Sequence, residues 1–381
     1  MKIVKGGVTQ PQGFQASGLS CGIKKSGKPD LSLIVSTVPC ASAAVFTKNT
    51  VKAAPLIVSK KHLSDGKAQA ILTNSGNANC FTGESGLKAA LKTAAVLAKD
   101  LGCRTTDIIV SSTGIIGKPL PVNKIIHGIP ELVRQLNSSF NAGHAAATAI
   151  MTTDTFVKEA AVRVNVGGKN ITIGGCAKGS GMIAPDMATM LAYITTDAAI
   201  ERKLLQEALA YAVQNSFNCI NVDGCMSTND MAVIMANSLA GNKFIQSRGE
   251  HFDKFCQALK SVCFDLAKKI VQDGEGAKKL IHVYVNGAPS ILAARKAAMA
   301  IANSNLVKTA AYGKNANWGR IAAAVGSTGL NVTEKTLRIT TKLLASKEVI
   351  IKTSLGMGKA GAMVLTCDLT EEYVKINGAY N

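Results

Sequence analysis

One threonine of this chain, Thr189, stands where a glycine-rich segment meets an apolar run. Before it the sequence reads Lys178-Gly-Ser-Gly-Met-Ile-Ala-Pro-Asp-Met-Ala188, and after it Met190-Leu-Ala-Tyr-Ile-Thr-Thr196, a run typical of a buried strand. If the Ala188–Thr189 bond breaks, Thr189 gains a free α-amine that can act as the base for its own Oγ, as in N-terminal-threonine nucleophiles. The local pattern by itself more often accompanies an ordinary glycine-rich loop that enters a core strand.

A second segment offers hydrogen-bond donors for a developing negative charge. Ser111-Ser-Thr-Gly-Ile-Ile-Gly117 follows an apolar run and presents the Thr113 hydroxyl and the Gly114 amide. Such a turn can hold an oxyanion, because a small residue lets N–H and Oγ approach the charge. Taken alone, the pattern is more often a plain strand-to-loop turn. It is not a P-loop, because the Gly-x-x-x-x-Gly-Lys-Ser/Thr spacing is absent.

Three further polar segments have two interpretations each. Residues 74–79 and 221–230 place small polar residues between apolar runs, as Asx-type turns or as loops that shape a substrate site. Glu275 stands between glycines in Asp273-Gly-Glu-Gly-Ala277, where a carboxylate can be solvated or can pair with a substrate ammonium.

The elements that must position these residues alternate along the chain without a visible linker or repeat. The expected strands are 70–74, 108–112, 160–166, 170–174, 190–196, 231–236 and 281–285, the last with the alternation of a half-buried strand. The expected amphipathic helices are 87–101, 200–215, 247–273 and 290–303. We therefore predict a layered α/β or α+β fold. The 381 residues allow two or three domains, or two large and closely packed halves.

Composition narrows the function classes. The net charge of +19 comes from lysines spread along the chain, with 4% aromatic residues and no basic-aromatic module, so we expect no nucleic-acid partner. The ten cysteines form no Cys-x-x-Cys pair and the five histidines are scattered, so we expect no metal site. No signal peptide and no apolar run long enough to span a membrane is visible, which makes the cytoplasm the default location.

Together, these segments resemble the ornithine acetyltransferase (ArgJ) family over nearly the whole chain. The block that joins Lys178-Gly-Ser-Gly-Met-Ile to Met187-Ala-Thr-Met-Leu is the most specific part of the resemblance. The other shared segments are Gly7–Phe14, Val45–Asn49, Asn74–Asn79, Ser112–Gly117, Ile150–Thr155, Ser227–Asp230, Asp273–Ala277, Asn317–Ile321 and Cys367–Thr370.

The resemblance implies a precursor that cleaves itself at Ala188–Thr189. It gives an α chain of residues 1–188 and a β chain of residues 189–381, which stay associated, usually as α2β2, in a DmpA-like layered fold related to N-terminal-nucleophile enzymes. The implied reaction is ping-pong: Thr189 takes acetyl from N2-acetylornithine and passes it to glutamate, in the arginine biosynthesis pathway. No cofactor is implied, and acetyl-CoA is an additional donor in bifunctional members.

The resemblance also assigns roles to individual residues. Thr113 and Gly114 correspond to the oxyanion-stabilising pair, and the substrate-contacting residues correspond to Thr152, Lys178, Glu275 and Asn377, together with Thr189 itself. Thr153 competes with Thr152 for its role. Lys178 would grip an α-carboxylate, and Glu275 would neutralise the ornithine side-chain ammonium.

The chain departs from the family pattern in several places. The tail Ile376-Asn-Gly-Ala-Tyr-Asn381 stops one residue short of the usual terminal hydroxyl residue, and residues 326–365 are contracted. The segments Asp223-Gly-Cys-Met and Asn315-Ala316 also differ from the usual residues. These changes bear on substrate choice more than on acyl-threonine chemistry. Two alternatives stay open: a self-processed amidase or aminopeptidase, and a binding protein with an inactive site.

Overall fold

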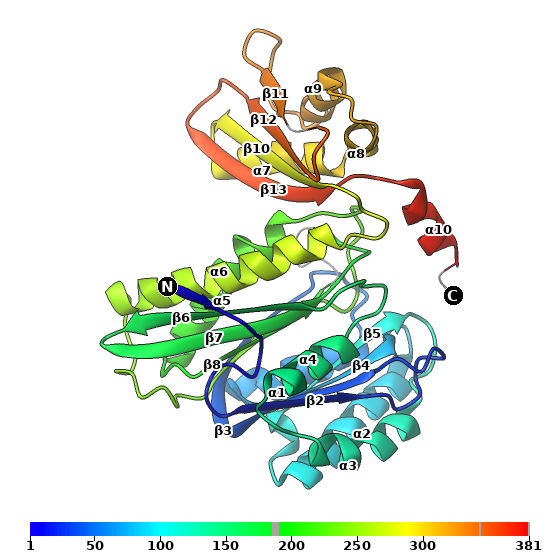
Figure 1. Ribbon diagram of the computed structural model, residues 1–381, viewed down its shortest axis with the longest axis vertical. Helices are drawn as coiled ribbons and strands as arrows, with labels where there is room; N and C mark the ends of the chain where they lie inside the picture. The colour runs from blue at the N-terminus through cyan, green and yellow to red at the C-terminus, as the bar shows by residue number, and fades with distance from the viewer. Residues whose placement is uncertain (185–189, 343, 380–381) are drawn as a thin grey trace.

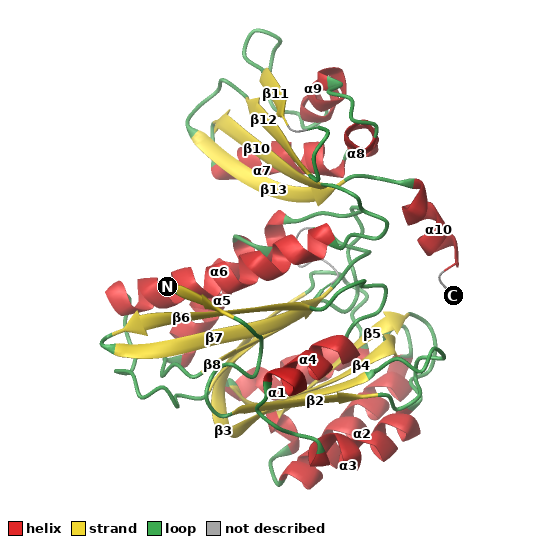
Figure 2. Cartoon of the chain, viewed as in Figure 1, coloured by secondary structure: helices red, strands yellow, loops and turns green. Residues whose placement is uncertain are grey.

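The computed structural model describes residues 1–184, 190–342 and 344–379. Within these residues the chain forms a nine-stranded sheet and a four-stranded sheet, and the long helix α6 (Glu250–Gln272) lies between them (Figure 1). The mixed layers of helices and strands confirm the predicted α/β class (Figure 2). No helix in this part of the chain is both long and apolar enough to cross a membrane.

The large sheet joins strands from distant parts of the sequence. Its order is β1 (Lys2–Val4), β6 (Lys158–Val166), β7 (Lys169–Lys178), β8 (Leu191–Thr196), β9 (Met231–Ala236), β3 (Leu31–Phe46), β4 (Lys67–Asn77) and β5 (Ile108–Ile115), and β2 (Phe14–Leu19) also pairs with β3. Strands β8 and β9, which follow Thr189 in the sequence, therefore lie between β7 and β3, which precede it.

The long strand β3 connects two arms of this sheet. Its residues 31–35 pair with β4, its residues 41–46 pair with β9, and the register shifts between Val35 and Cys40, where Pro39 interrupts the ladder. Strands β2, β4 and β5 form one arm, and β6 to β9 form the other. The arms share a buried core that includes Phe14, Ile71 and Tyr193.

Residue alternation along the strands explains how each arm is covered. On β8, Leu191 and Tyr193 face the shared core, whereas Ala192 and Ile194 pack with α5 (Arg202–Gln214) and α6 (Glu250–Gln272). On the other arm, helices α1 (Ala54–His62), α2 (Gly83–Leu101) and α3 (Val122–Arg134) cover β3 to β5, and α4 (Phe140–Ala149) packs on β2. The two arms of the large sheet therefore share one core, and helices cover the outer face of each arm.

The four-stranded sheet forms a smaller unit at one end of the molecule (Figure 1). Its order is β11 (Arg338–Lys342), β12 (Glu348–Ser354), β10 (Leu280–Ala288) and β13 (Ala360–Cys367). Helices α7 (Ile291–Asn303), α8 (Asn305–Tyr312) and α9 (Trp318–Gly326) enclose its core, and α10 (Glu371–Ala379) leads away from β13. Short 3-10 turns span Leu63–Asp65, Thr105–Asp107 and Phe217–Cys219.

Candidate active site

Apart from Thr189, which lies outside the described residues, the residues expected to touch a substrate come together although they span positions 113–377. They line a single pocket near the ends of β5 and β7: Thr113, Gly114, Thr152, Thr153, Lys178, Glu275 and Asn377. Ala78, Ser227 and Asn229 of the two polar loops also line this pocket, so both loops reach the site that one interpretation assigned to them. Asx-type and related turns are present as well, because the Asn79 amide donates to Asn77 Oδ1 and the Asn229 amide donates to Ser227 Oγ.

The turn that carries Thr113 and Gly114 is an irregular end of β5. The register between β4 and β5 shifts after Gly76, and Asn77 faces both Thr113 and Ile115. Gly114 has a φ of +130°, and a Cβ on it would lie 2.4 Å from the carbonyl carbon of Gly76. Only glycine fits this conformation and this approach, which fixes the direction of the backbone at a proposed oxyanion donor.

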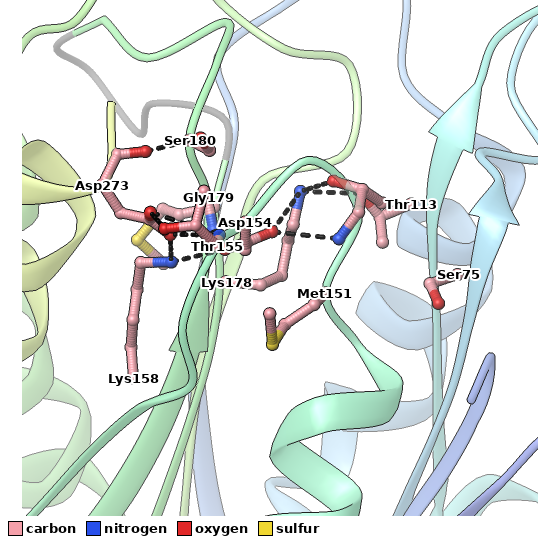
Figure 3. A network of polar contacts seen from close by, with 12 residues as sticks. Ser75, Thr113, Met151, Asp154, Thr155, Lys158, Lys178, Gly179, Ser180 and Asp273 are labelled. Atoms are coloured by element: carbon pink, nitrogen blue, oxygen red, sulfur yellow. Dashed lines mark hydrogen bonds and ion pairs between the residues drawn. The ribbon is translucent and has the colours of Figure 1, made fainter. Parts of the chain in front are cut away.

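Lys178 ends β7 and is almost fully buried at the wall of the pocket. Its Nζ donates to Thr152 Oγ1 at 2.7 Å and to Thr113 Oγ1 at 3.4 Å, and lies 3.9 Å from Asp154 Oδ2 (Figure 3). Burial lowers the pKa of Lys178 below the usual lysine range, although Asp154 opposes this shift. The hydrogen bond to Thr152 distinguishes it from Thr153, which also lines the pocket.

Behind Lys178 lies a buried chain of charges. Lys158, whose side chain is 0% exposed, donates to Asp154 Oδ1 at 2.6 Å and also binds Asp273 (Figure 3). The amides of Thr152 and Gly179 donate to the Asp154 carboxylate at 3.0 and 2.8 Å. Burial alone would raise the pKa of Asp154, but the charges of Lys178 and Lys158 hold it well below its usual range.

A second wall of the pocket carries a carboxylate. Glu275 follows the end of α6, and Asn377 of α10 donates to its Oε2 at 2.8 Å. A Cβ on Gly181 would lie 2.2 Å from Glu275 Oε2, so the glycine-rich segment after Lys178 allows Glu275 to lie against its backbone. The Glu275 amide also donates to the Ser180 carbonyl at 3.0 Å. One wall therefore offers hydroxyl and ammonium donors, and the other offers a negatively charged hydrogen-bond acceptor.

Comparison with known proteins shows the family to which this chain belongs. A sequence model of the ArgJ family matches residues 15–343 and 340–381. The chain belongs to the ArgJ family. It is 46% identical to the arginine biosynthesis bifunctional protein ArgJ of Symbiobacterium thermophilum over 100% of both chains, and 47% identical to the protein of that name from Caldanaerobacter subterraneus, also over 100% of both. It is also similar to the solved ornithine acetyltransferase of Mycobacterium tuberculosis, crystallised with ornithine, at 38% identity over 48% of this chain and 97% of that one, with a TM-score of 0.46.

The expected cleavage site of this ArgJ family member, Ala188 and Thr189, lies outside the described residues. The described residues on either side are anchored by carboxylates. Asp223 accepts from the amides of Met182 and Ile183, at 2.6 and 3.0 Å, and Asp230 Oδ1 accepts from the Met190 amide at 3.0 Å. Burial raises the pKa of Asp230 well above the usual aspartate range.

Three charged residues at this site, Asp154, Lys158 and Asp273, had no predicted role. Asp154 lies in the Ile150–Thr155 segment and Asp273 in the Asp273–Ala277 segment, but linear spacing carries no sign that Lys158 joins them. The part of the chain that the structure describes has no group of three His, Cys, Asp or Glu side chains arranged to hold a metal ion.

Proposed function

We propose that this protein is a glutamate N-acetyltransferase of arginine biosynthesis, which moves acetyl from N2-acetylornithine to L-glutamate through acetyl-Thr189. The pocket that joins Thr113, Gly114, Lys178 and Glu275 carries this proposal most directly. The curated relatives, which are named as arginine biosynthesis bifunctional proteins, support the pathway. Their description as bifunctional also supports acetyl-CoA as a second acyl donor.

The chemistry of the two walls suits these substrates. Thr152 and Lys178 offer hydrogen bonds and positive charge to an α-carboxylate, and Glu275, held by Asn377, offers negative charge to the side-chain ammonium of ornithine. The Thr113 hydroxyl and Gly114 amide would stabilise the tetrahedral oxyanion formed when Thr189 Oγ attacks the acetyl carbonyl. Ornithine then leaves as the amine. In the second half-reaction the glutamate α-amine attacks the acetyl carbonyl of acetyl-Thr189, and Thr189 Oγ leaves.

Self-cleavage at Ala188–Thr189 would supply the nucleophile. In this proposal Thr189 Oγ attacks the Ala188 carbonyl, and the amide becomes an ester as its C–N bond breaks and frees the α-amine. Water then hydrolyses the ester, which leaves a carboxylate on Ala188 and a free Oγ on Thr189. The new α-amine titrates near pH 8 and can exchange a proton with Oγ. Strands β8 and β9 would stay in place after cleavage, because they pair with β7 and β3 of the first chain. This interleaving supports the association of the two chains. Their pairing as α2β2 rests on the family resemblance.

The partition of the acyl group tests the proposal. Purified protein is incubated with N-acetylornithine and glutamate, and separately with acetyl-CoA and glutamate. We expect N-acetylglutamate from the first mixture, and from the second as well if the chain is bifunctional. Free acetate as the only product would favour a hydrolase and would overturn the transferase proposal.

A further inference from the structure

The hydrogen bonds of Lys178 determine which way two neighbouring hydroxyl hydrogens can point. A lysine ammonium has three donors and no acceptor, so the oxygens of Thr113 and Thr152 must accept from it. Each hydroxyl then keeps its own hydrogen for a different partner. The described residues give the Thr113 hydroxyl no acceptor, and Thr113 lines the pocket.

We propose that Asp154 is a positioning residue that acts through Lys178: by keeping Lys178 an ammonium, it directs the Thr113 hydroxyl hydrogen into the pocket. This inference rests on the proposed function, in which Thr113 stabilises the oxyanion. A neutral Lys178 amine would carry a lone pair and could accept from Thr113, which would turn that hydrogen away from the pocket.

The charges around Lys178 make its protonation depend on Asp154. Lys178 is nearly buried, and an unpaired buried ammonium readily loses its proton. Asp154 favours the charged form, as do Glu275 and Asp230, which approach from other elements, whereas Lys158 disfavours it. Lys24, which donates to the Met151 carbonyl beside Thr152, adds a further positive charge nearby. Asp154 is the acidic side chain that the structure places in an ion pair with Lys178.

A double-mutant cycle tests whether Asp154 acts through the Thr113 hydroxyl. The readout is the rate at which saturating N-acetylornithine acetylates Thr189 in a single turnover, measured on the cleaved protein, because saturation excludes any change in the affinity of Lys178 for the substrate carboxylate. Thr113→Val removes the hydroxyl and keeps the shape of the side chain. Asp154→Asn should slow acetylation in the Thr113 background, by no more than Thr113→Val does, and should have little further effect in the Thr113→Val background. Two independent effects that multiply would overturn the proposal.

The pH profile supplies a readout that a purely structural role would not move. Acetylation should fall on the alkaline side as Lys178 loses its proton, and Asp154→Asn should move that fall to lower pH. Lys158→Met removes a positive charge beside the pair, so it should move the fall to higher pH. Thermal unfolding of both variants monitors the fold. If Asp154→Asn does not fold, Lys158→Met alone tests the proposal. An alkaline fall in acetylation that stays at the same pH in this variant, or moves to lower pH, would contradict the proposal.

These outcomes are distinct from a failure of the proposed function. If the wild-type chain never acquires acetyl from N-acetylornithine, the transferase proposal fails and the role of Asp154 fails with it. If the wild-type chain acetylates normally while the two variants combine multiplicatively, only the role of Asp154 is refuted.

Discussion

Replacing Glu275 by glutamine should damage one half of the reaction more than the other. Glu275 is only 9% exposed, and its Oε2 is already held by Asn377, which leaves the other oxygen for a ligand. Ornithine carries a side-chain ammonium that this carboxylate can bind, whereas glutamate carries none. The substitution keeps the shape of the side chain and removes its charge, so it isolates the electrostatic part of the contact.

The size of the effect follows from the burial of this group. A hydrogen bond to a charged partner contributes about 1.5–3 kcal/mol, which is roughly ten- to a hundredfold in kcat/KM. Little solvent reaches Glu275 to screen its charge, so we expect a loss within this range for the donor N-acetylornithine. Transfer from acetyl-Thr189 to glutamate should change less.

Single-turnover acetylation of Thr189 by N-acetylornithine separates the two half-reactions. Glu371→Gln is the matched control, because it makes the same charge change at an exposed position at the start of α10 and should leave both half-reactions unchanged. If Glu275→Gln acetylates at the wild-type rate and loses only the transfer to glutamate, the assignment of Glu275 to the ornithine ammonium is wrong.

Further substitutions probe the oxyanion turn, the wall of the pocket and the shared core. Thr113→Ala should lower turnover by about two to three orders of magnitude with a smaller change in KM, because a donor aimed at a transition-state charge contributes roughly 2.7–4 kcal/mol. Normal steady-state turnover in this variant would mean that the turn has only a structural role. Lys178→Ala should impair transfer from N-acetylornithine and to glutamate alike, and a loss confined to one half-reaction would refute a shared pocket. Tyr193→Phe should lower the free energy of unfolding by about 1–3 kcal/mol, because its hydroxyl connects the two arms through Thr73 and Ser111 and its loss leaves buried polar groups unpaired. An unchanged denaturant midpoint would contradict this prediction.

Much of the fold could be predicted from hydrophobic periodicity. The predicted strand 281–285 lies within β10 and shows the expected alternation. The predicted helix 247–273 corresponds to α6, which begins three residues later and ends one residue earlier than predicted. These elements pack through one apolar face, which leaves a periodic signal in the sequence.

Other elements left no such signal. Strand β3 bends at Pro39 and carries serines, alanines and a cysteine, and it is buried on both faces for much of its length. Helix α3 contains Pro130, a residue that predicts the end of a helix, but the helix continues through it. Strand β11 alternates exposed and half-buried residues, with little apolar content to mark it. Tertiary packing rather than local propensity sets these elements.

The candidate site also has a part that the sequence predicts and a part that it does not. Thr113, Gly114, Thr152, Lys178, Glu275 and Asn377 stand in motifs that the family resemblance identifies, and the fold brings them to one pocket. The ion pairs of Lys158 with Asp154 and Asp273 could not be predicted, because one spans a gap of 115 residues and no motif joins its partners.

The central claim is that Thr189 becomes a new N-terminus and carries acetyl. The intact masses of purified wild-type protein, before and after incubation with N-acetylornithine alone, test it most directly, with Thr189→Ala as the control. We predict two fragments, residues 1–188 and 189–381, of which only the second gains one acetyl group, and a variant that stays full length and unmodified. A wild-type chain that remains whole, a variant that is cut at the same bond, or acetyl found elsewhere than on the second fragment would contradict the account.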